Sequence, residues 1–249
     1  MTAVAIRKEE GEEDALAARA RRLSAQYGGE DAADIIRRAV LQEFPGRIAL
    51  VSSFGAESAP LLHLVAEAAP ETPVLFLDTG KHFAQTLSYR KKLARELGLK
   101  NIVDIHPDAE HVKSADPRGD LWRADTDACC NIRKVIPLEK ALQGYDAWIT
   151  GRKQFHGGER VALPVFEASG RFIKVNPIVR WRPDDIAAYA AAHALPAHPL
   201  VEQGYPSIGC WPCTHPAAPG EDPRAGRWRG AAKTECGIHR IGRQVGAAA

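Results

Sequence analysis

Four of the five cysteines stand in two close pairs, a pattern suited to a metal centre. Cys210 and Cys213 form a C-x-x-C pair in a Pro/Gly-rich stretch, which is typical of a metal knuckle and also of a redox dithiol. Cys129 and Cys130 are adjacent, so their side chains would point about 100° apart on a helix. The separated corners of an iron–sulphur cluster suit such neighbours better than one zinc ion does, although neither ferredoxin spacing matches. Burial as ordinary apolar residues is the alternative for Cys129 and Cys130.

Cys236 stands outside both pairs and could act as a nucleophile. Between positions 224 and 243 there are six basic residues and one acidic residue, Glu235. Such surroundings lower the pKa of a thiol and attract an anionic substrate. An incidental surface cysteine is the alternative.

Composition and charge narrow the class of protein. The 249 residues allow one large domain or two small ones, and 45% hydrophobic with 26% charged residues is typical of soluble globular proteins. A net charge of +2 is too small to indicate nucleic acid or an anionic membrane as the main partner. We find no apolar membrane span and no export signal, and we expect a cytoplasmic protein. Since disulfides are rare there, and five is an odd number, metal binding or thiol chemistry is favoured.

Strands that alternate with helices must position these groups. A mostly parallel, twisted α/β sheet with helices on both faces is predicted. The expected strands are 47–53, 73–78, 101–105 and 146–150, with weaker ones at 161–166 and 171–175. The expected helices are 32–44, 58–69, 82–97 and one that starts near Pro183.

Composition also divides the chain into three parts. Residues 1–30 form a charged leader, and 31–209 form an α/β nucleotide-binding domain that carries two cluster cysteines. Residues 210–249 form an irregular C-terminal segment with the C-x-x-C pair and a mobile tail that bears Cys236. Because apolar periodicity is weak beyond Ala194, something other than a core must order that segment.

Three strand ends carry loops suited to a nucleotide. Ser52–Ser58 is a Ser/Gly loop between a strand and a helix, where backbone N–H groups can cradle a phosphate, although it is not a Walker A loop. Leu77–Gly80 and Thr150–Arg152 end two further strands, and Arg160 follows. Since open α/β sheets bind ligands at this edge, we predict a nucleotide pocket. An ordinary solvated surface is the alternative for the arginines.

Taken together, these segments resemble the assimilatory sulfonucleotide reductases of the iron–sulphur type, which reduce adenosine 5′-phosphosulfate. The resemblance rests on VSSFGAES, FLDTGKHF, ACCNIRKVIPL, TGRKQ, GCWPCTHP, PGEDPRAGRW and KTECGIH. It implies a fold similar to the adenine nucleotide alpha hydrolases and ATP pyrophosphatases. The sequence departs from the family's pattern at Ser58, where many relatives are acidic, and at Lys81, where arginine is common.

The resemblance also implies roles for individual residues. It implies a [4Fe–4S] cluster held by Cys129, Cys130, Cys210 and Cys213. It implies catalytic roles for Cys236, His239 and Lys134. It implies a substrate site made of Ser52, Ser53, Phe54, Gly55, Glu57, Ser58, Asp78, Thr79, Gly80, Arg152, Arg160, Arg224 and Arg227.

The implied reaction is attack of the Cys236 thiolate on the phosphosulfate sulphur, which displaces AMP and leaves an S-sulfocysteine. Thioredoxin or glutaredoxin would then release sulfite, in sulfate assimilation and cysteine biosynthesis. Three rivals remain: a reductase of 3′-phosphoadenosine 5′-phosphosulfate, a zinc-stabilised nucleic-acid-binding module, and an ATP pyrophosphatase of the same fold. The oligomeric state is open, and a homo-oligomer is one alternative.

Overall fold

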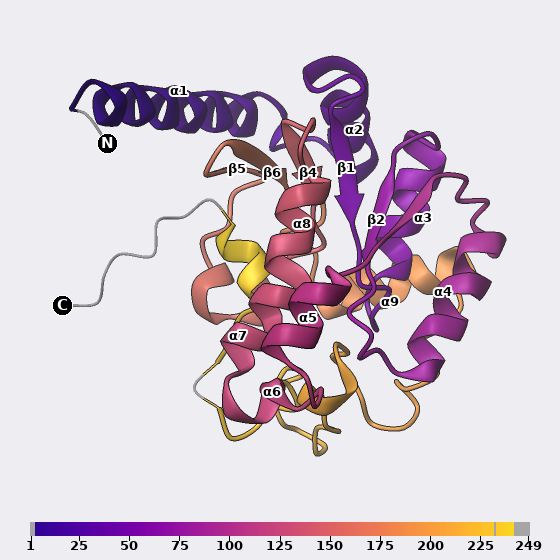
Figure 1. The fold of residues 1–249 in the computed structure, drawn as a ribbon. Coiled ribbons are helices and arrows are strands. Elements are labelled where there is room, and N and C mark those ends of the chain that lie inside the picture. The colour runs from indigo at the N-terminus through magenta and orange to yellow at the C-terminus, as the bar shows by residue number, and fades with distance from the viewer. Residues whose placement is uncertain (1–2, 232, 242–249) are drawn as a thin grey trace.

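A six-stranded sheet forms the centre of the computed structural model, which describes residues 3–231 and 233–241 (Figure 1). The strand order is β3-β2-β1-β4-β6-β5, and every neighbouring pair is parallel except the β5–β6 hairpin. The strands are β1 Ile48–Val51, β2 Val74–Leu77, β3 Ile102–Ile105, β4 Ala147–Ile149, β5 Phe166–Ser169 and β6 Phe172–Val175. The predicted mostly parallel sheet is confirmed.

Helices cover both faces of this sheet (Figure 1). One core contains apolar side chains of α1 Ala3–Tyr27, α2 Ala32–Arg37, α3 Ala59–Ala68 and α4 Ala84–Glu96, with α9 Pro183–Ala192 packed against it. On the other side lie α5 Ala109–Ala115, α6 Leu121–Ala124, α7 Thr126–Cys130 and α8 Ile136–Ala141. Two π-helices, η1 Arg38–Glu43 and η2 Asn131–Val135, continue α2 and α7. The 3-10 turns are η3 Gln154–His156, η4 Gly158–Arg160, η5 Trp211–Cys213 and η6 Gly237–Arg240.

Alternation along the strands separates two hydrophobic cores. Leu50 of β1 faces the first core, whereas its neighbour Ala49 faces the second, beside Trp148 of β4. Apolar side chains of α8 and Ile241 cover the second core on the side away from the sheet, and Ile241 is only 3% exposed. The C-terminal turn is therefore part of the core on that face.

Two predicted elements differ from the structure. The strand predicted at 161–166 is wrong: this stretch begins as a turn in which the Leu163 amide donates to the Arg160 carbonyl at 3.1 Å, and β5 begins only at Phe166. Pro164 has no N–H to donate to a neighbouring strand, which explains why the strand begins only after it. The helix predicted over 32–44 splits into α2 and the π-helix η1, whereas the helix predicted from Pro183 is confirmed as α9.

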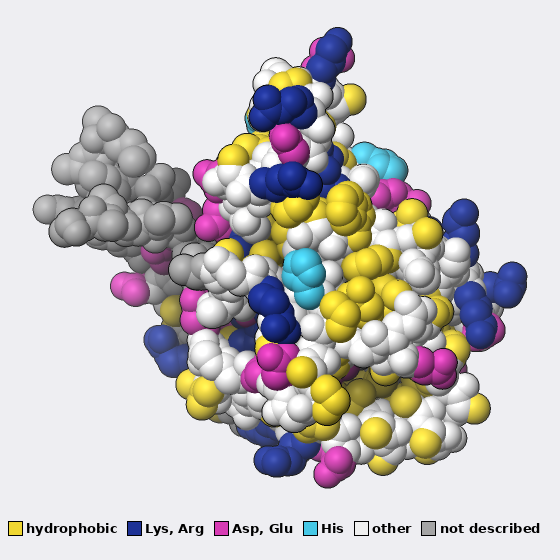
Figure 2. Space-filling model, turned by 90° about the horizontal axis from the view of Figure 1, so that it is seen from below, with side chains coloured by type: hydrophobic (Ala, Val, Ile, Leu, Met, Phe, Trp, Pro, Cys, Tyr) yellow, Lys and Arg dark blue, Asp and Glu magenta, His cyan; other side chains and the backbone are white. Residues whose placement is uncertain are grey.

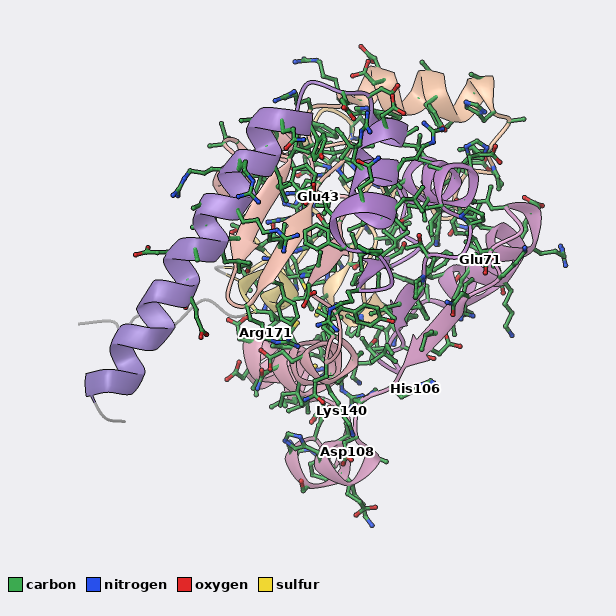
Figure 3. The ribbon with its side chains drawn as sticks, turned by 90° about the horizontal axis from the view of Figure 1, so that it is seen from above. Glu43, Glu71, His106, Asp108, Lys140 and Arg171 are labelled. Carbon is green, nitrogen blue, oxygen red and sulfur yellow. The ribbon has the colours of Figure 1, made fainter. Side chains whose placement is uncertain are left out.

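The predicted boundaries at residues 30 and 209 stay predictions. The last turns of α1 pack on the body, since Leu23 is 1% exposed and Tyr27 donates to the Glu43 carboxylate at 3.0 Å. Figure 3 shows the other end of the same helix extending past the sheet. Within the described ranges, no helix combines the length and the apolar character that a membrane crossing needs.

Candidate active site and metal centre

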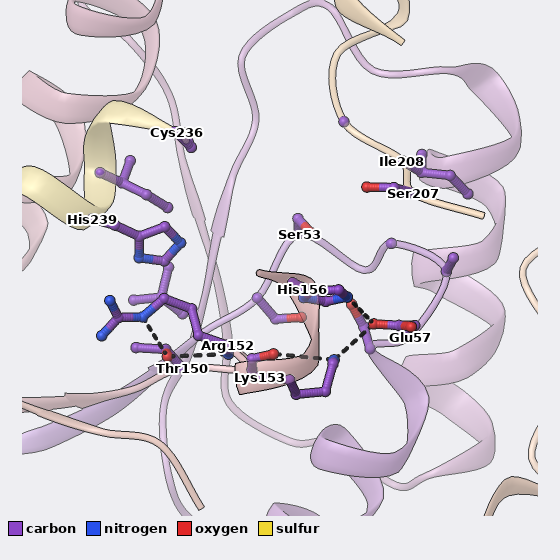
Figure 4. A pocket seen from close by; sticks show the side chains of 18 of the residues that line it. Ser53, Glu57, Thr150, Arg152, Lys153, His156, Ser207, Ile208, Cys236 and His239 are labelled. Atoms are coloured by element: carbon purple, nitrogen blue, oxygen red, sulfur yellow. Dashed lines mark hydrogen bonds and ion pairs between the residues drawn. The ribbon is translucent and has the colours of Figure 1, made fainter. Parts of the chain in front are cut away.

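A cavity opens at the carboxyl edge of the sheet, between the ends of β1 and β4 and the C-terminal segment (Figure 4). Seen from that edge, hydrophobic side chains gather beside histidine and charged side chains of both signs (Figure 2). Twelve of the predicted site residues line the cavity: Ser52, Ser53, Gly55, Glu57, Ser58, Lys134, Arg152, Arg160, Arg224, Arg227, Cys236 and His239. The structure thus brings together most of the residues that the sequence predicts for the site.

The loop after β1 forms the first wall. Phe54 has a left-handed φ of 49°, is fully buried and meets Phe76 edge to face at 5.7 Å. It therefore anchors the loop from beneath and does not line the cavity, unlike its neighbours Ser53 and Gly55. A Cβ at Gly55 would lie 3.2 Å from the Ile208 carbonyl oxygen, so the opposite wall approaches the loop closely. The loop precedes the N-terminus of α3, the arrangement that binds phosphate through backbone amides.

A partly buried ion-pair cluster, which sequence reasoning missed, joins this loop to the one after β4. The Glu57 carboxylate accepts from Lys153 at 2.8 Å and lies 3.2 Å from His156 (Figure 4). Lys153 is 3% exposed, and both partners line the cavity. Their signal in the sequence was the basic run that follows the fourth strand. The cluster fixes the distance between the two loops.

Replacing Glu57 by glutamine tests this cluster through pH. Burial alone raises the pKa of Glu57, but the His156 hydrogen bond and the Lys153 charge outweigh burial and lower the pKa from 4.5 to about 2. This shift corresponds to about 3 kcal/mol at neutral pH, and the buried Lys153 ammonium, whose pKa is lowered, offsets part of it. Glu57→Gln should therefore lower the free energy of unfolding by about 1–3 kcal/mol at neutral pH.

A carboxyl whose folded pKa is lowered stabilises the fold above its unfolded pKa and loses this effect as the pH falls. The deficit of Glu57→Gln should accordingly shrink as the pH falls from 4.5 towards 2. Urea unfolding at neutral and acidic pH measures it, with the exposed Glu202→Gln as the matched control. A deficit that is constant with pH would contradict the ion-pair role.

Two of the four predicted arginines are held in buried ion pairs. Arg152 is 5% exposed and pairs with Glu167, while Arg160 is 8% exposed and donates to both oxygens of Glu235, at 2.6 and 2.8 Å. A solvated surface is therefore the wrong description of these two side chains. Since Glu235 precedes Cys236, the Arg160 pair also holds the segment that carries the nucleophile.

The other two arginines keep donor capacity towards the cavity. Arg224 donates to the Thr234 carbonyl at 3.0 Å, and its charge lies 3.8 Å from Glu235. Arg227 lies over the Trp228 ring at 4.4 Å, and its buried Nε has no hydrogen-bond partner among the described residues. A guanidinium with a spare donor suits an anionic ligand.

Cys236 and His239 form the third wall, at the turn η6 (Figure 4). A hydrogen bond from the Cys130 thiol lowers the pKa of Cys236 well below its ordinary value, and the charges of Lys134 and Arg227 act in the same direction, although burial opposes the shift. Only the two charges act when Cys130 is deprotonated as a metal ligand. The predicted thiolate character of Cys236 therefore has a local cause. Burial and the charge of Arg152 lower the pKa of His239, which keeps its imidazole neutral at neutral pH.

The four remaining cysteines share a second cavity behind the first. Cys129, Cys130, Cys210 and Cys213 all line it. No three Cys, His, Asp or Glu side chains of the described residues converge closely enough to hold one ion. Lys81, Arg133, Lys134 and Arg227 line the same cavity. Four thiols spread around one cavity that cations also line fit a polynuclear iron–sulphur cluster better than a single zinc ion.

Local backbone structure explains how adjacent cysteines reach one cavity. The α-helix α7 ends at Cys130, and the chain continues as the π-helix η2, a widened turn that is frequent at functional sites. A π turn, and not an α-helical turn, therefore lies between Cys130 and Lys134. Across the cavity, the Trp211 amide donates to the Lys81 carbonyl at 2.9 Å and fixes the C-x-x-C turn. Lys134 lines both cavities and links the two sites.

Three predicted substrate residues lie outside both cavities. Asp78, Thr79 and Gly80 do not line the nucleotide cavity. The Thr79 hydroxyl lies 3.3 Å from Cys210 Sγ, and its carbonyl accepts from Arg133 at 3.0 Å. Lys81 of the same loop lines the second cavity, whereas Leu77 and His82, on either side of the loop, line the first.

Comparison with known proteins shows which family the chain resembles. A family model described as the phosphoadenosine phosphosulfate reductase domain matches residues 47–216, more than half of the chain. A protein from Mesorhizobium japonicum named adenosine 5′-phosphosulfate reductase is 52% identical over 233 residues, 94% of this chain and 92% of that protein. One of the same name from Mycobacterium tuberculosis is 41% identical over 184 residues, covering 73% and 72% of the two chains.

Solved structures give the same answer. The phosphoadenylyl-sulfate reductase of Candida auris superposes with a TM-score of 0.66 at 29% identity, over 79% of this chain and 96% of that one. An FMN adenylyltransferase of Candida glabrata, 15% identical, shares the fold alone, with a TM-score of 0.54 over 91% and 82% of the chains. The predicted fold class and the resemblance are confirmed, and the chain belongs to the phosphoadenosine phosphosulfate reductase family.

Proposed function

We propose that the chain reduces adenosine 5′-phosphosulfate to sulfite and AMP in sulfate assimilation, with Cys236 as the nucleophile. The observation that carries the proposal is the position of Cys236, which lines the same cavity as the phosphate-type loop after β1. Lys134, Arg224 and Arg227 line this cavity as well, so a bound phosphosulfate would meet three cations beside the thiol. Relatives that cover most of the chain carry the corresponding name.

The chemistry follows from these positions. The Cys236 thiolate attacks the sulphate sulphur, an Sγ–S bond forms, the S–O bond to the phosphate breaks, and AMP leaves. Arg224 and Arg227 stabilise the charge that grows on the leaving phosphate. The neutral His239 lines the same cavity as the thiol, and its Nδ1 has no partner among the described residues, so it is available to the sulphate.

The second half of the reaction needs an external dithiol. One donor thiolate attacks Cys236 Sγ and expels sulfite, and the second donor thiol closes a disulfide and frees Cys236. The two electrons therefore come from the donor, for which we propose thioredoxin in the cytoplasm, on a route to cysteine. Cys236 is only partly exposed, so the tail has to move outward for this step.

We further propose that Cys129, Cys130, Cys210 and Cys213 hold a [4Fe–4S] cluster. Such a cluster would add negative charge next to Lys134 and tie the irregular C-terminal segment to α7. The Lys134 ammonium would then lie between the cluster and the bound substrate, since Lys134 lines both cavities.

The experiment uses the anaerobically purified protein with thioredoxin and adenosine 5′-phosphosulfate. Sulfite and AMP should appear in equal amounts, and omission of thioredoxin should leave an S-sulfo adduct on Cys236. Faster turnover of the 3′-phosphorylated nucleotide would replace the proposed substrate with that compound, and equal turnover would indicate use of both. The absence of an adduct with either nucleotide would contradict the proposed chemistry.

A further inference from the structure

A buried row of three side chains crosses the sheet beneath the C-terminal turn. Trp148 on β4 and Glu167 on β5 are the register partners of Lys174 on β6, so the three share one face. Trp148 and Lys174 are fully buried, and Glu167 is 8% exposed. Burying an ammonium is costly unless strong hydrogen bonds compensate it, so the complete burial of Lys174 needs a structural explanation.

The C-terminal turn supplies part of that reason. Lys174 Nζ donates to the His239 carbonyl at 2.7 Å, and the Trp148 ring stacks on the His239 imidazole, 5.9 Å away and 5° from parallel. Ser169 Oγ donates to the Ile241 carbonyl at 2.9 Å. We refer to Trp148, Ser169 and Lys174 as the tail seat.

Both ends of the turn are thereby fastened, with Cys236 between them. On the upstream side, Glu235 is held by Arg160. On the downstream side, the tail seat binds main-chain oxygens, which do not depend on side-chain identity. Glu167 connects the row to the nucleotide cavity, because it pairs with the cavity residue Arg152.

We propose that Lys174 is a positioning residue for Cys236, and that the tail seat holds the C-terminal turn in the position from which the thiol attacks. This inference rests on the proposed function, since it assigns the docked turn to the first half of that reaction. Release of the turn from the seat then exposes Cys236 to the reducing dithiol. The bond from Lys174 to the His239 carbonyl favours the first step and has to be broken for the second.

The two half-reactions should therefore respond differently when the seat is weakened. Lys174→Met keeps the length and apolar stem of the side chain and removes its donor. S-sulfocysteine formation should slow by about tenfold, as expected for the loss of one charge-assisted hydrogen bond. Release of sulfite by the dithiol should be unchanged or faster, and the affinity for AMP should be unchanged, since Lys174 does not line the cavity.

Docking is measured independently of the reaction by hydrogen–deuterium exchange of the 235–241 peptide in the intact, iron-loaded protein. Lys174→Met should raise its exchange rate by about tenfold. Ser169→Ala, which removes only the bond to Ile241 and leaves the buried charge in place, should change the same observables in the same direction by a smaller factor. The exposed Lys140→Met is the matched control and should change neither observable.

Equal slowing of both half-reactions, or unchanged exchange in Lys174→Met, would overturn the positioning role. If Lys174→Met does not fold, the same two measurements on Ser169→Ala decide the question. If the wild-type protein forms no S-sulfo adduct, the proposed function fails, and the exchange data still decide whether the seat docks the turn.

Discussion

Replacing Cys236 by serine is expected to reduce sulfite release at least about a thousandfold, because a hydroxyl cannot replace a thiolate as the nucleophile or form the S-sulfo intermediate. The local structure should persist, since the Cys236 amide bonds to the Glu235 carboxylate and the turn remains on the tail seat. Steady-state sulfite release with thioredoxin measures the loss. AMP affinity should be unchanged, because the loop after β1 and the arginines are untouched.

The control is the iron content of the same preparation, which should equal that of the wild type because Cys236 is not among the proposed ligands. Residual sulfite release above about one-tenth of the wild-type rate would exclude Cys236 as the nucleophile. Loss of iron together with activity would instead place Cys236 in the metal centre.

Replacing Cys213 by serine is expected to remove most of the iron, from about four atoms per chain to a small fraction, because serine is a poor ligand for an iron–sulphur cluster. The C-x-x-C turn should then lose its tie to α7, and the segment after α9 should become sensitive to proteolysis, since it contains few hydrogen-bonded elements of its own. Iron and sulphide assays, visible absorption and limited proteolysis measure these effects.

Cys236→Ser provides the matched comparison, since it makes the same atomic change at a cysteine that lies outside the proposed ligand set. Wild-type protein that holds one zinc ion per chain and no sulphide would rule out the cluster. This result would instead identify the cysteine cavity as a structural zinc site.

The sheet was predictable because strands covered on both faces are continuous apolar runs. β2 is buried along its whole length and was predicted to within one residue at each end. The stretch 161–166 has the alternating apolar residues of an edge strand, at Val161, Leu163 and Val165. Val161 is 63% exposed, however, and Pro164 cannot donate a backbone hydrogen bond to a neighbouring strand. No strand forms there despite the hydrophobic pattern.

The site residues were predictable where a single loop contains the residues that act together. Strand ends and cysteine pairs are local signals, and together with the family resemblance they identified twelve residues that line the first cavity and the four cysteines that line the second. The pairing of Glu57 with Lys153 and His156 joins loops far apart in the sequence, which no local pattern encodes. The strand-end rule also locates only an edge of the sheet, so it could not show that Asp78, Thr79 and Gly80 line neither cavity there.

The position of Ile241 in the second core also bears on how the molecule is made. Ile241 belongs to the same core as Ala49 and Leu75, so this core joins residues almost two hundred positions apart in the chain. During synthesis, the part of this core that the C-terminal turn covers stays exposed until that turn has left the ribosome. The same late residues bring the reactive thiol, so a nascent chain becomes chemically competent only when its last core contacts can form. Maturation of the core and of the reactive site thus coincide.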